Sequence, residues 1–326
     1  MSKNTIDRKS GGHSPAAAGW CLLFLLILLP ILAMTGCTGP AGFRRSDLPL
    51  ADSPRYLLDS VPFFPQKVYQ CGPAALAMAL SWSGVHLSPD DLTPEVFTLS
   101  KKGSLQSAMI AAVRRHDRIA WLLPAPDALL DELRAGNPVI VLQNLGLAWY
   151  PVWHYAVVIG LDLEKGNVIL HSGVTQEKHV ALERFNRTWR RGDYWGLVVL
   201  PPSRLPDRAE EADYLRAVGP LERLKKWTVA ARAYRSALAR WPGSLAARLG
   251  LGACLYESGD LEAAEAVFRE TTVNFPHDGA AFNNLAQVLM DQGRADDALE
   301  AIRHAIQLGG PLTPQFEETL REIRRQ

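Results

Sequence analysis

The sequence of 326 residues predicts an α+β domain followed by an all-α repeat region. Two observations support this prediction: helix-like runs come before strand-like runs in the middle of the chain, and the C-terminal third is periodic. The expected helices span 72–83, 104–115 and 126–134. The expected strands span 138–145, 154–162, 166–172 and 194–200. Because the helices precede the strands, we expect a mostly antiparallel sheet.

The composition is that of a globular protein rather than a disordered one, with 48% hydrophobic and 21% charged residues. A net charge of +1 gives no indication of a nucleic-acid partner. The cysteines show no CxxC spacing, which argues against a zinc site or a thioredoxin-like motif. They are Cys21, Cys37, Cys71 and Cys254. We expect neither a metal nor a cofactor.

The first 36 residues have the pattern of an export signal. Basic residues near the start are followed by an apolar segment at 16–34, and small residues come next. The apolar segment is nearly long enough to span a membrane, but Pro30 and the small residues after it favour a cleaved signal peptide over an anchor.

The end of this signal resembles a bacterial lipobox, Met34-Thr35-Gly36-Cys37, with Met34 where Leu is usual. The resemblance implies cleavage before Cys37 and lipid on its thiol. Thr38, in place of the Asp that favours inner-membrane retention, indicates the outer membrane, facing the periplasm. Residues 37–57 then read as a tether.

The C-terminal region, 208–326, repeats every 34 residues. The repeat relates Gly259 to Gly293, Ala264 to Ala298, and Pro242 to Pro276. This period, with small residues where helices touch, resembles the tetratricopeptide repeat. Three units and a closing helix are expected, with Lys225 in place of the turn glycine in the first. Such repeats commonly bind a peptide or protein, although a purely structural cap remains an alternative.

The stretch VYQCGPAALAMAL, 68–80, predicts the start of a helix, with Cys71 at or beside its N-cap. Pro73 is favoured in the first turn, where its missing N–H costs nothing. A helix N-terminus lowers the pKa of a thiol and so favours the nucleophilic thiolate. Cys71 is therefore the candidate nucleophile. Cys254 lies on an apolar helix face and reads as a buried small hydrophobe.

Two further residues complete a candidate site. His154 begins a predicted strand and can serve as the proton acceptor for Cys71. Gln66 lies five residues before Cys71, and its side-chain amide can join the Cys71 N–H in holding an oxyanion. We expect Gln70, the immediate neighbour of the cysteine, to point away.

The segments VPFFPQKVYQCGPAALAMAL and HYAVVIGLD resemble the bacteriocin-processing (double-glycine-leader) cysteine peptidases of the papain-like clan. The resemblance implies a domain over 58–203, with Cys71 as nucleophile, His154 as general base and then acid, and Gln66 at the oxyanion hole. The combination of lipobox, peptidase-like domain and repeats is similar to a group of proteobacterial lipoproteins described as cysteine peptidases.

The chain departs from this family at the residue that orients the histidine. The family has an Asp on the following strand, where this sequence has Leu170-His171-Ser172-Gly173. Ser172 matches the Asp position, so it is the candidate orienting residue, with His171 on the other face of the strand. Asp162 lies at the far end of the histidine strand, roughly 26 Å from His154 at about 3.3 Å per residue.

The sequence therefore predicts an exported cysteine peptidase whose repeats bind a protein or peptide. A peptidoglycan amidase or a transglutaminase-like enzyme on the same fold is an alternative, and so is a degenerate, non-enzymatic scaffold. Ser104 is expected to cap a helix. Four tryptophans either line a cleft or belong to the core: Trp149, Trp153, Trp189 and Trp195.

Overall fold

A computed structural model describes residues 55–67 and 69–325. It confirms the predicted fold class: a sheet-containing domain over about 55–200 precedes a helical region over about 211–323. The predicted signal peptide, the lipidation site at Cys37 and nearly all of the tether lie outside the described residues. Among the residues described, no helix has the length and apolar character needed to cross a membrane.

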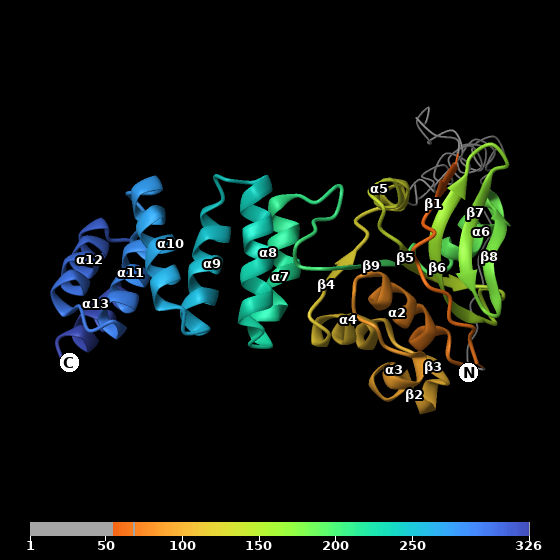
Figure 1. Cartoon of the computed structure of the whole chain (residues 1–326), viewed down its shortest axis with the longest axis horizontal. Helices are drawn as coiled ribbons and strands as arrows, with labels where there is room; N and C mark the ends of the chain where they lie inside the picture. The colour runs from red at the N-terminus through yellow and green to blue at the C-terminus, as the bar shows by residue number, and fades with distance from the viewer. Residues whose placement is uncertain (1–54, 68, 326) are drawn as a thin grey trace, which may run out of the picture. The chain divides into compact units, whose positions relative to one another are not determined.

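The first domain is built on a seven-stranded sheet (Figure 1). Its order is β4-β9-β5-β6-β7-β8, β1 also pairs with β6, and every pair is antiparallel, as predicted. The strands are β1 Arg55–Leu57, β4 Ile119–Leu122, β5 Val139–Asn144, β6 Trp153–Asp162, β7 Asn167–Ser172, β8 Thr175–Ala181 and β9 Gly196–Leu200.

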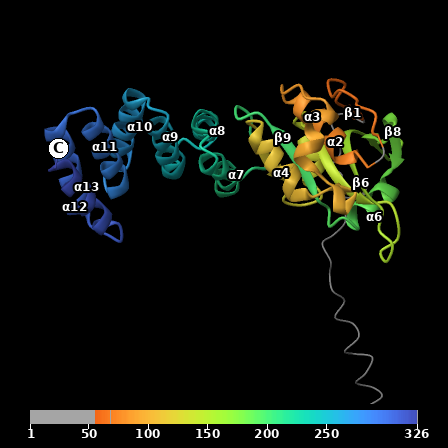
Figure 2. The ribbon, with the colours of Figure 1, turned by 90° about the horizontal axis from the view of Figure 1, so that it is seen from below.

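Helices cover both faces of this sheet, as alternate residues of β6 show. Tyr155 and Val157 belong to a core shared with α2 (Cys71–Trp82), α3 (Pro89–Val96) and α4 (Gln106–Arg115). Ala156 and Val158 belong to the core on the other face, shared with α5 (Ala128–Arg134) and α6 (Leu182–Arg190). Figure 2 shows α2 and α4 from a second direction.

Helix α2 is buried along almost its whole length, from Gly72 to Ser81. Its Ala, Leu and Met residues favour a helix and leave no polar face. At its first turn, a Cβ built on Gly72 would lie 2.2 Å from the Ser104 hydroxyl, so only glycine fits there. The start of α2 is therefore fixed against a neighbouring strand.

That neighbour is β3 (Gly103–Ser104), which pairs with β2 (Phe97–Thr98) across the short 3-10 helix η3 (Leu99–Lys101). The expectation that Ser104 caps a helix is wrong. The N-cap of α4 is Leu105, without a side-chain cap, because Ser104 is paired in β3 and faces the start of α2.

The C-terminal region contains seven helices over 211–323. They are α7 Glu211–Arg223, α8 Trp227–Arg240, α9 Leu245–Glu257, α10 Leu261–Asn274, α11 Gly279–Asp291, α12 Ala295–Leu308 and α13 Thr313–Ile323. Gly259 and Gly293, with φ of 83° and 77°, turn the chain between paired helices. Lys225 takes the same left-handed conformation, with φ of 56°, in the unit that lacks the glycine. Cys254 is 1% exposed, as predicted.

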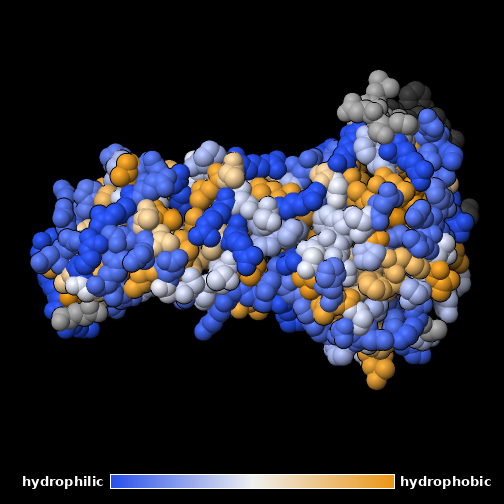
Figure 3. Space-filling model, in the orientation of Figure 1, coloured by the Kyte–Doolittle hydropathy of each residue, from blue (hydrophilic) through white to orange (hydrophobic). Residues whose placement is uncertain are grey.

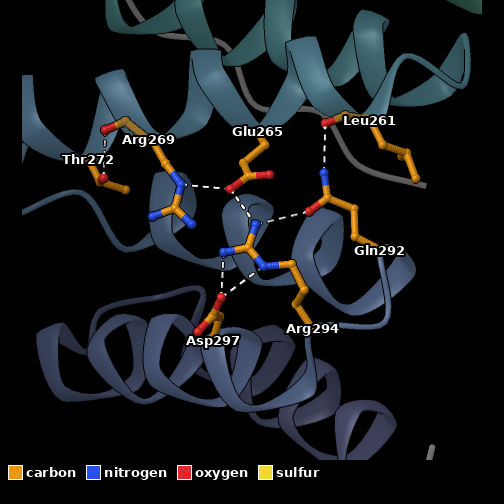
Figure 4. Close-up of polar contacts among 7 residues, drawn as sticks. All are labelled: Leu261, Glu265, Arg269, Thr272, Gln292, Arg294 and Asp297. Carbon is orange, nitrogen blue, oxygen red and sulfur yellow. Dashed lines mark hydrogen bonds and ion pairs between the residues drawn. The ribbon is translucent and has the colours of Figure 1, made fainter.

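Ion pairs join neighbouring repeat units (Figure 4). The Glu265 carboxylate on α10 accepts from Arg269 on the same helix and from Arg294 at the start of α12, each at 2.7 Å. These two guanidinium groups contribute to a Glu265 pKa of about 2, well below its usual value, against the opposing effect of burial. On the face shown in Figure 3, hydrophilic surface predominates and is interrupted by apolar patches.

Candidate active site

A cleft of about 1120 Å³ brings three of the predicted site residues together: Gln66, Cys71 and His154. Cys71 is the first residue of α2, with Gln70 at the N-cap, as the sequence predicted. His154 is the second residue of β6. The thiol and the imidazole therefore reach one cleft from a helix start and a strand start.

The Cys71 thiol is half-buried, and burial raises its pKa above the ordinary value. Hydrogen bonds from the backbones of Tyr155, Gly72 and Cys71 itself act in the opposite direction, since they favour the thiolate. The expected lowering by the helix N-terminus is therefore outweighed by desolvation. At neutral pH the resting cysteine is a thiol with thiolate-stabilising donors already in place.

His154 contacts Ser172, the candidate orienting residue of the sequence analysis. Its Nε2 lies 2.9 Å from the Ser172 hydroxyl oxygen. When Nε2 carries the proton, the ring donates to that hydroxyl and leaves Nδ1 to accept a proton. Nδ1 has no hydrogen-bond partner in the part of the chain that the structure describes.

The surroundings of His154 disfavour the imidazolium. Burial, and after it the positive charge of Lys178 on β8, together lower its pKa from 6.5 to about 4. A carboxylate beside the ring would oppose both effects, but Ser172 is uncharged. The imidazole is therefore neutral at physiological pH and is in the form that accepts a proton.

Gln66 is held beside the strand that carries His154. Its backbone N–H donates to the Gly173 carbonyl at 3.0 Å, and its Nε2 donates to the Tyr155 carbonyl at 3.4 Å. Gln70 turns the other way, since its Nε2 lies 3.4 Å from Thr93 Oγ1 on α3. Of the two glutamines, Gln66 alone is among the residues that line the cleft, in agreement with the sequence analysis.

His171 and Asp162 are not part of the site. His171 is 2% exposed and donates from Nε2 to the Val61 carbonyl, while its Nδ1 accepts from the Glu177 N–H. Asp162 pairs with Asn167 at the far end of the β6–β7 hairpin. Both placements agree with the sequence analysis, which put His171 on the other face of its strand from Ser172 and Asp162 at the far end of the histidine strand.

Three of the four tryptophans divide between the two alternatives, whereas Trp149 is 81% exposed and is not among the residues that line the cleft. Trp153 lines the cleft and is 52% exposed, whereas Trp189 on α6 is fully buried. Trp195 packs edge-on against the ring of Tyr155, with centroids 5.7 Å apart. Sequence reasoning missed Tyr155. Its backbone forms a hydrogen bond with the Cys71 thiol, and its hydroxyl donates to the Ser104 carbonyl at 3.2 Å. Its position directly after His154 was the available signal.

No cluster of three or more metal-ligating side chains occurs within residues 55–67 and 69–325. The groups that the cleft offers are a thiol, a neutral imidazole and amide donors. This set suits nucleophilic attack on a carbonyl, with the proton passing from Sγ to the imidazole.

Family models match both regions of the chain. Residues 58–194 match the Peptidase_C39 like family. Residues 221–278 and 258–313 match the tetratricopeptide repeat. No curated protein matches this sequence.

Several solved structures are similar to parts of this chain at low identity. A putative C39-like peptidase from Bacillus anthracis is 17% identical, covering 45% of this chain and 97% of its own, with a TM-score of 0.38. The Yersinia enterocolitica type III secretion translocator chaperone SycD is 18% identical, covering 35% of this chain and 92% of its own, with a TM-score of 0.34.

The Sgt2 TPR domain from Aspergillus fumigatus is 21% identical, covering 35% of this chain and 77% of its own, with a TM-score of 0.33. Together with the family models, the observed elements define both parts of the molecule. The chain therefore has a sheet-containing domain that matches the Peptidase_C39 like family, followed by a helical region that matches the tetratricopeptide repeat.

Proposed function

We propose that this protein is a cysteine peptidase that hydrolyses peptide bonds with Cys71 as nucleophile and His154 as base. The observation that carries this proposal is the shared cleft, in which the start of α2, the start of β6 and Gln66 converge within a domain that matches the Peptidase_C39 like family. A binding scaffold has no need of all three groups in one place.

In the proposed reaction, the Cys71 thiol gives its proton to Nδ1 of His154 as Sγ attacks the substrate carbonyl. Gln66 Nε2 leaves its long bond to Tyr155 and, with the Cys71 backbone N–H, donates to the developing oxyanion. The imidazolium then protonates the amine as the C–N bond breaks. Water next attacks the thioester while giving a proton to Nδ1, and the C–S bond breaks to release the carboxylic acid and restore the Cys71 thiol. Ser172 holds the ring through Nε2 during these proton transfers.

A peptide-cleavage screen tests this proposal. Full-length chain purified in detergent is incubated with a library of peptides of diverse sequence, and new termini are identified by mass spectrometry. We expect cleavage that disappears in Cys71→Ala and falls by roughly 10³-fold or more in His154→Ala. Identical product patterns from the wild type and Cys71→Ala would contradict the proposal.

One observation favours a non-enzymatic alternative. Lys178 disfavours the imidazolium that must form during attack, and Ser172 supplies no compensating charge. In that case the cleft would bind peptides without cleaving them. The screen separates the two, since a scaffold retains peptides in the wild type and in Cys71→Ala alike while releasing no products.

We also propose that the protein is exported and carries lipid on Cys37, on the outer membrane facing the periplasm. The support is the motif Met34-Thr35-Gly36-Cys37 after an apolar segment. Expression in a Gram-negative host with an alkyne-labelled fatty acid tests it. We expect labelling and membrane retention that are both lost in Cys37→Ser, and an unlabelled wild type would refute the idea.

A further inference from the structure

One wall of the cleft is formed by the loop between β5 and β6, which runs directly into His154. This loop and Trp153, the first residue of β6, form an apolar segment, 145–153, whose large apolar side chains are each between 47% and 81% exposed: Leu145, Leu147, Trp149, Tyr150, Val152 and Trp153. Soluble surfaces seldom gather so many apolar side chains without a binding role. Since Tyr150, Val152 and Trp153 also line the cleft, this apolar surface is continuous with the site of Cys71.

The wall on the Cys71 side is positively charged rather than apolar. Ser104 of β3 packs against Gly72 at the start of α2, and the residues just before it bring Lys101 and Lys102 to the cleft. Neither lysine has a carboxylate partner among the residues described. The Lys102 ammonium lies over the ring of Tyr69, 6.0 Å from its centroid.

The charges around the cleft do not balance. Lys67 is already paired with both oxygens of Asp90, at 2.9 and 3.0 Å. Asp193 is the one carboxylate among the described residues that line the cleft, and His154 is neutral. Lys101 and Lys102 therefore leave an excess of positive charge, which attracts a negatively charged ligand.

Two residues on the Cys71 side of the cleft have an unfavourable backbone conformation. Tyr69 and Lys102 both adopt left-handed conformations, with φ of 64° and 48°. Such conformations are uncommon outside glycine and cluster at functional sites. Both residues line the cleft on the side that carries Lys101 and Lys102, which supports a role for that wall in binding.

We infer that the cleft binds an extended peptide with an acidic side chain beside Lys101 and Lys102 and a large apolar side chain against the apolar segment 145–153. These side chains lie on either side of the bond presented to Cys71. The cleavage step rests on the proposed peptidase function, but the binding preference does not require it.

Peptide binding to the full-length Cys71→Ala chain in detergent tests this inference. The probes are fluorescein-labelled Ser/Gly dodecapeptides that carry a Leu-Phe pair and a Glu-Glu pair, in both orders and separated by two to six residues. Matched peptides replace Glu-Glu with Gln-Gln, or Leu-Phe with Ser-Ser. We expect the best acidic and apolar peptides to bind ~10-fold more tightly than either matched form, with the preference for Glu weakening as salt rises.

Variants on the Cys71→Ala background assign each preference to its wall. Lys101→Gln combined with Lys102→Gln should abolish the preference for Glu over Gln. Tyr150→Ser should reduce the preference for Leu-Phe. Lys165→Gln, an exposed lysine in the β6–β7 turn, is the matched control and should keep both preferences.

Equal binding of the three peptide classes, or a preference for Glu that survives loss of both lysines, would overturn the inference. If Tyr150→Ser left the preference for Leu-Phe unchanged, the apolar segment 145–153 would not be the site that binds the apolar side chain. Because Cys71→Ala cannot cleave, a failed cleavage screen with intact binding preferences refutes only the peptidase function. Cleavage without these preferences refutes only the inference.

Discussion

At the residue scale, the two reactive groups of the cleft are neutral at rest. Burial raises the pKa of Cys71 and lowers that of His154 to about 4. At pH 7 the proton is therefore on sulfur and the imidazole is ready to accept it. Attack and proton transfer must occur together, rather than from a preformed thiolate–imidazolium pair.

Replacing Ser172 with Asp should create such an ion pair. A carboxylate near Nε2 stabilises the imidazolium and raises the His154 pKa by roughly 1–3 units. A charged ring in turn favours the thiolate, so the midpoint of iodoacetamide alkylation at Cys71 should move to lower pH. Rates measured by mass spectrometry from pH 5 to 10 check this. Ser172→Asn, similar in size but uncharged, is the control, and an equal midpoint in Asp and Asn variants contradicts the account.

The two glutamines near Cys71 should differ in their effect on catalysis. Gln66→Ala removes a proposed oxyanion donor, so we expect kcat to fall ~10²-fold with little change in KM. Gln70→Ala serves as the matched control, because its amide is directed to Thr93 and away from the cleft. Steady-state kinetics on a peptide found in the screen provide the measurement. Equal losses in both variants would remove Gln66 from the oxyanion hole.

The sequence predicted which residues meet, but not their charge states. Gln66, Cys71, His154 and Ser172 follow from one helix start and one hairpin, which are local patterns. The effect of Lys178 depends on β8, an almost wholly exposed strand whose polar residues show no alternation. Burial of the thiol depends on the packing of distant segments, so its raised pKa could not be deduced from the helix N-terminus.

At the element scale, long apolar patterns were predictable and short or exposed ones were not. The predicted strand at 154–162 corresponds to β6, and the predicted helix at 72–83 to α2. Strand β4 has only four residues, and β8 is an exposed edge. Helix α6 was also missed, although Leu182, Phe185 and Trp189 are buried at helical spacing. Its many charged residues drew attention to the solvent face.

A substitution in the turn between α7 and α8 should stabilise the protein. Lys225 is exposed and left-handed, in the position that Gly259 and Gly293 occupy one and two periods later. Lys225→Gly relieves this conformation but adds freedom to the unfolded chain, so we expect a net gain of ~0.5–1 kcal/mol in the free energy of unfolding. Urea unfolding checks this. Lys225→Ala should give no gain, and a glycine variant no more stable than the wild type contradicts the argument.

At the scale of the whole molecule, a buried carboxyl links the peptidase-like domain to the chain entering the repeats. Glu132 on α5 is 1% exposed. Its oxygens accept from the Asp207 N–H at 3.2 Å and from Asn137 Nδ2 at 2.6 Å. Arg240 on α8 donates to the carbonyls of Pro206 and Asp207. The linker before α7 is thus held from both sides.

Glu132 should make stability depend on pH. Burial, opposed by its hydrogen bonds, raises its pKa from 4.5 to about 7. Because the pKa of Glu132 is higher in the folded protein than in the unfolded chain, the protonated carboxyl stabilises the folded state at pH values below the unfolded-state pKa. This stabilisation is lost as the pH rises through about 7. Across that window the loss is roughly 3 kcal/mol.

Glu132→Gln removes this titration. Relative to the wild type, the variant should therefore gain roughly 2.5 kcal/mol in unfolding free energy between pH 5 and pH 8. Urea unfolding at the two pH values gives the difference. Asp127→Asn, at an exposed carboxylate near the same linker, is the control. A wild-type-to-Gln difference that is the same at both pH values would rule out Glu132 as the source.

The division into two parts was predictable because each part has its own sequence pattern. A 34-residue repeat identifies the helical region, and helices before strands identify the α+β domain. The ionic contacts that hold the linker could not be anticipated, because they join residues far apart in sequence with no shared pattern. The same is true of the two unlike walls of the cleft, which come from separate loops.

The central claim is that Cys71 is a peptide-recognising nucleophile assisted by His154. Covalent labelling by a peptidyl vinyl sulfone tests it most directly, because the reaction needs both a bound peptide and a proton donor. The account predicts a single adduct at Cys71, none in Cys71→Ala, and a rate at least ~10²-fold lower in His154→Ala. Labelling at Cys254, or an unchanged rate without His154, would contradict it.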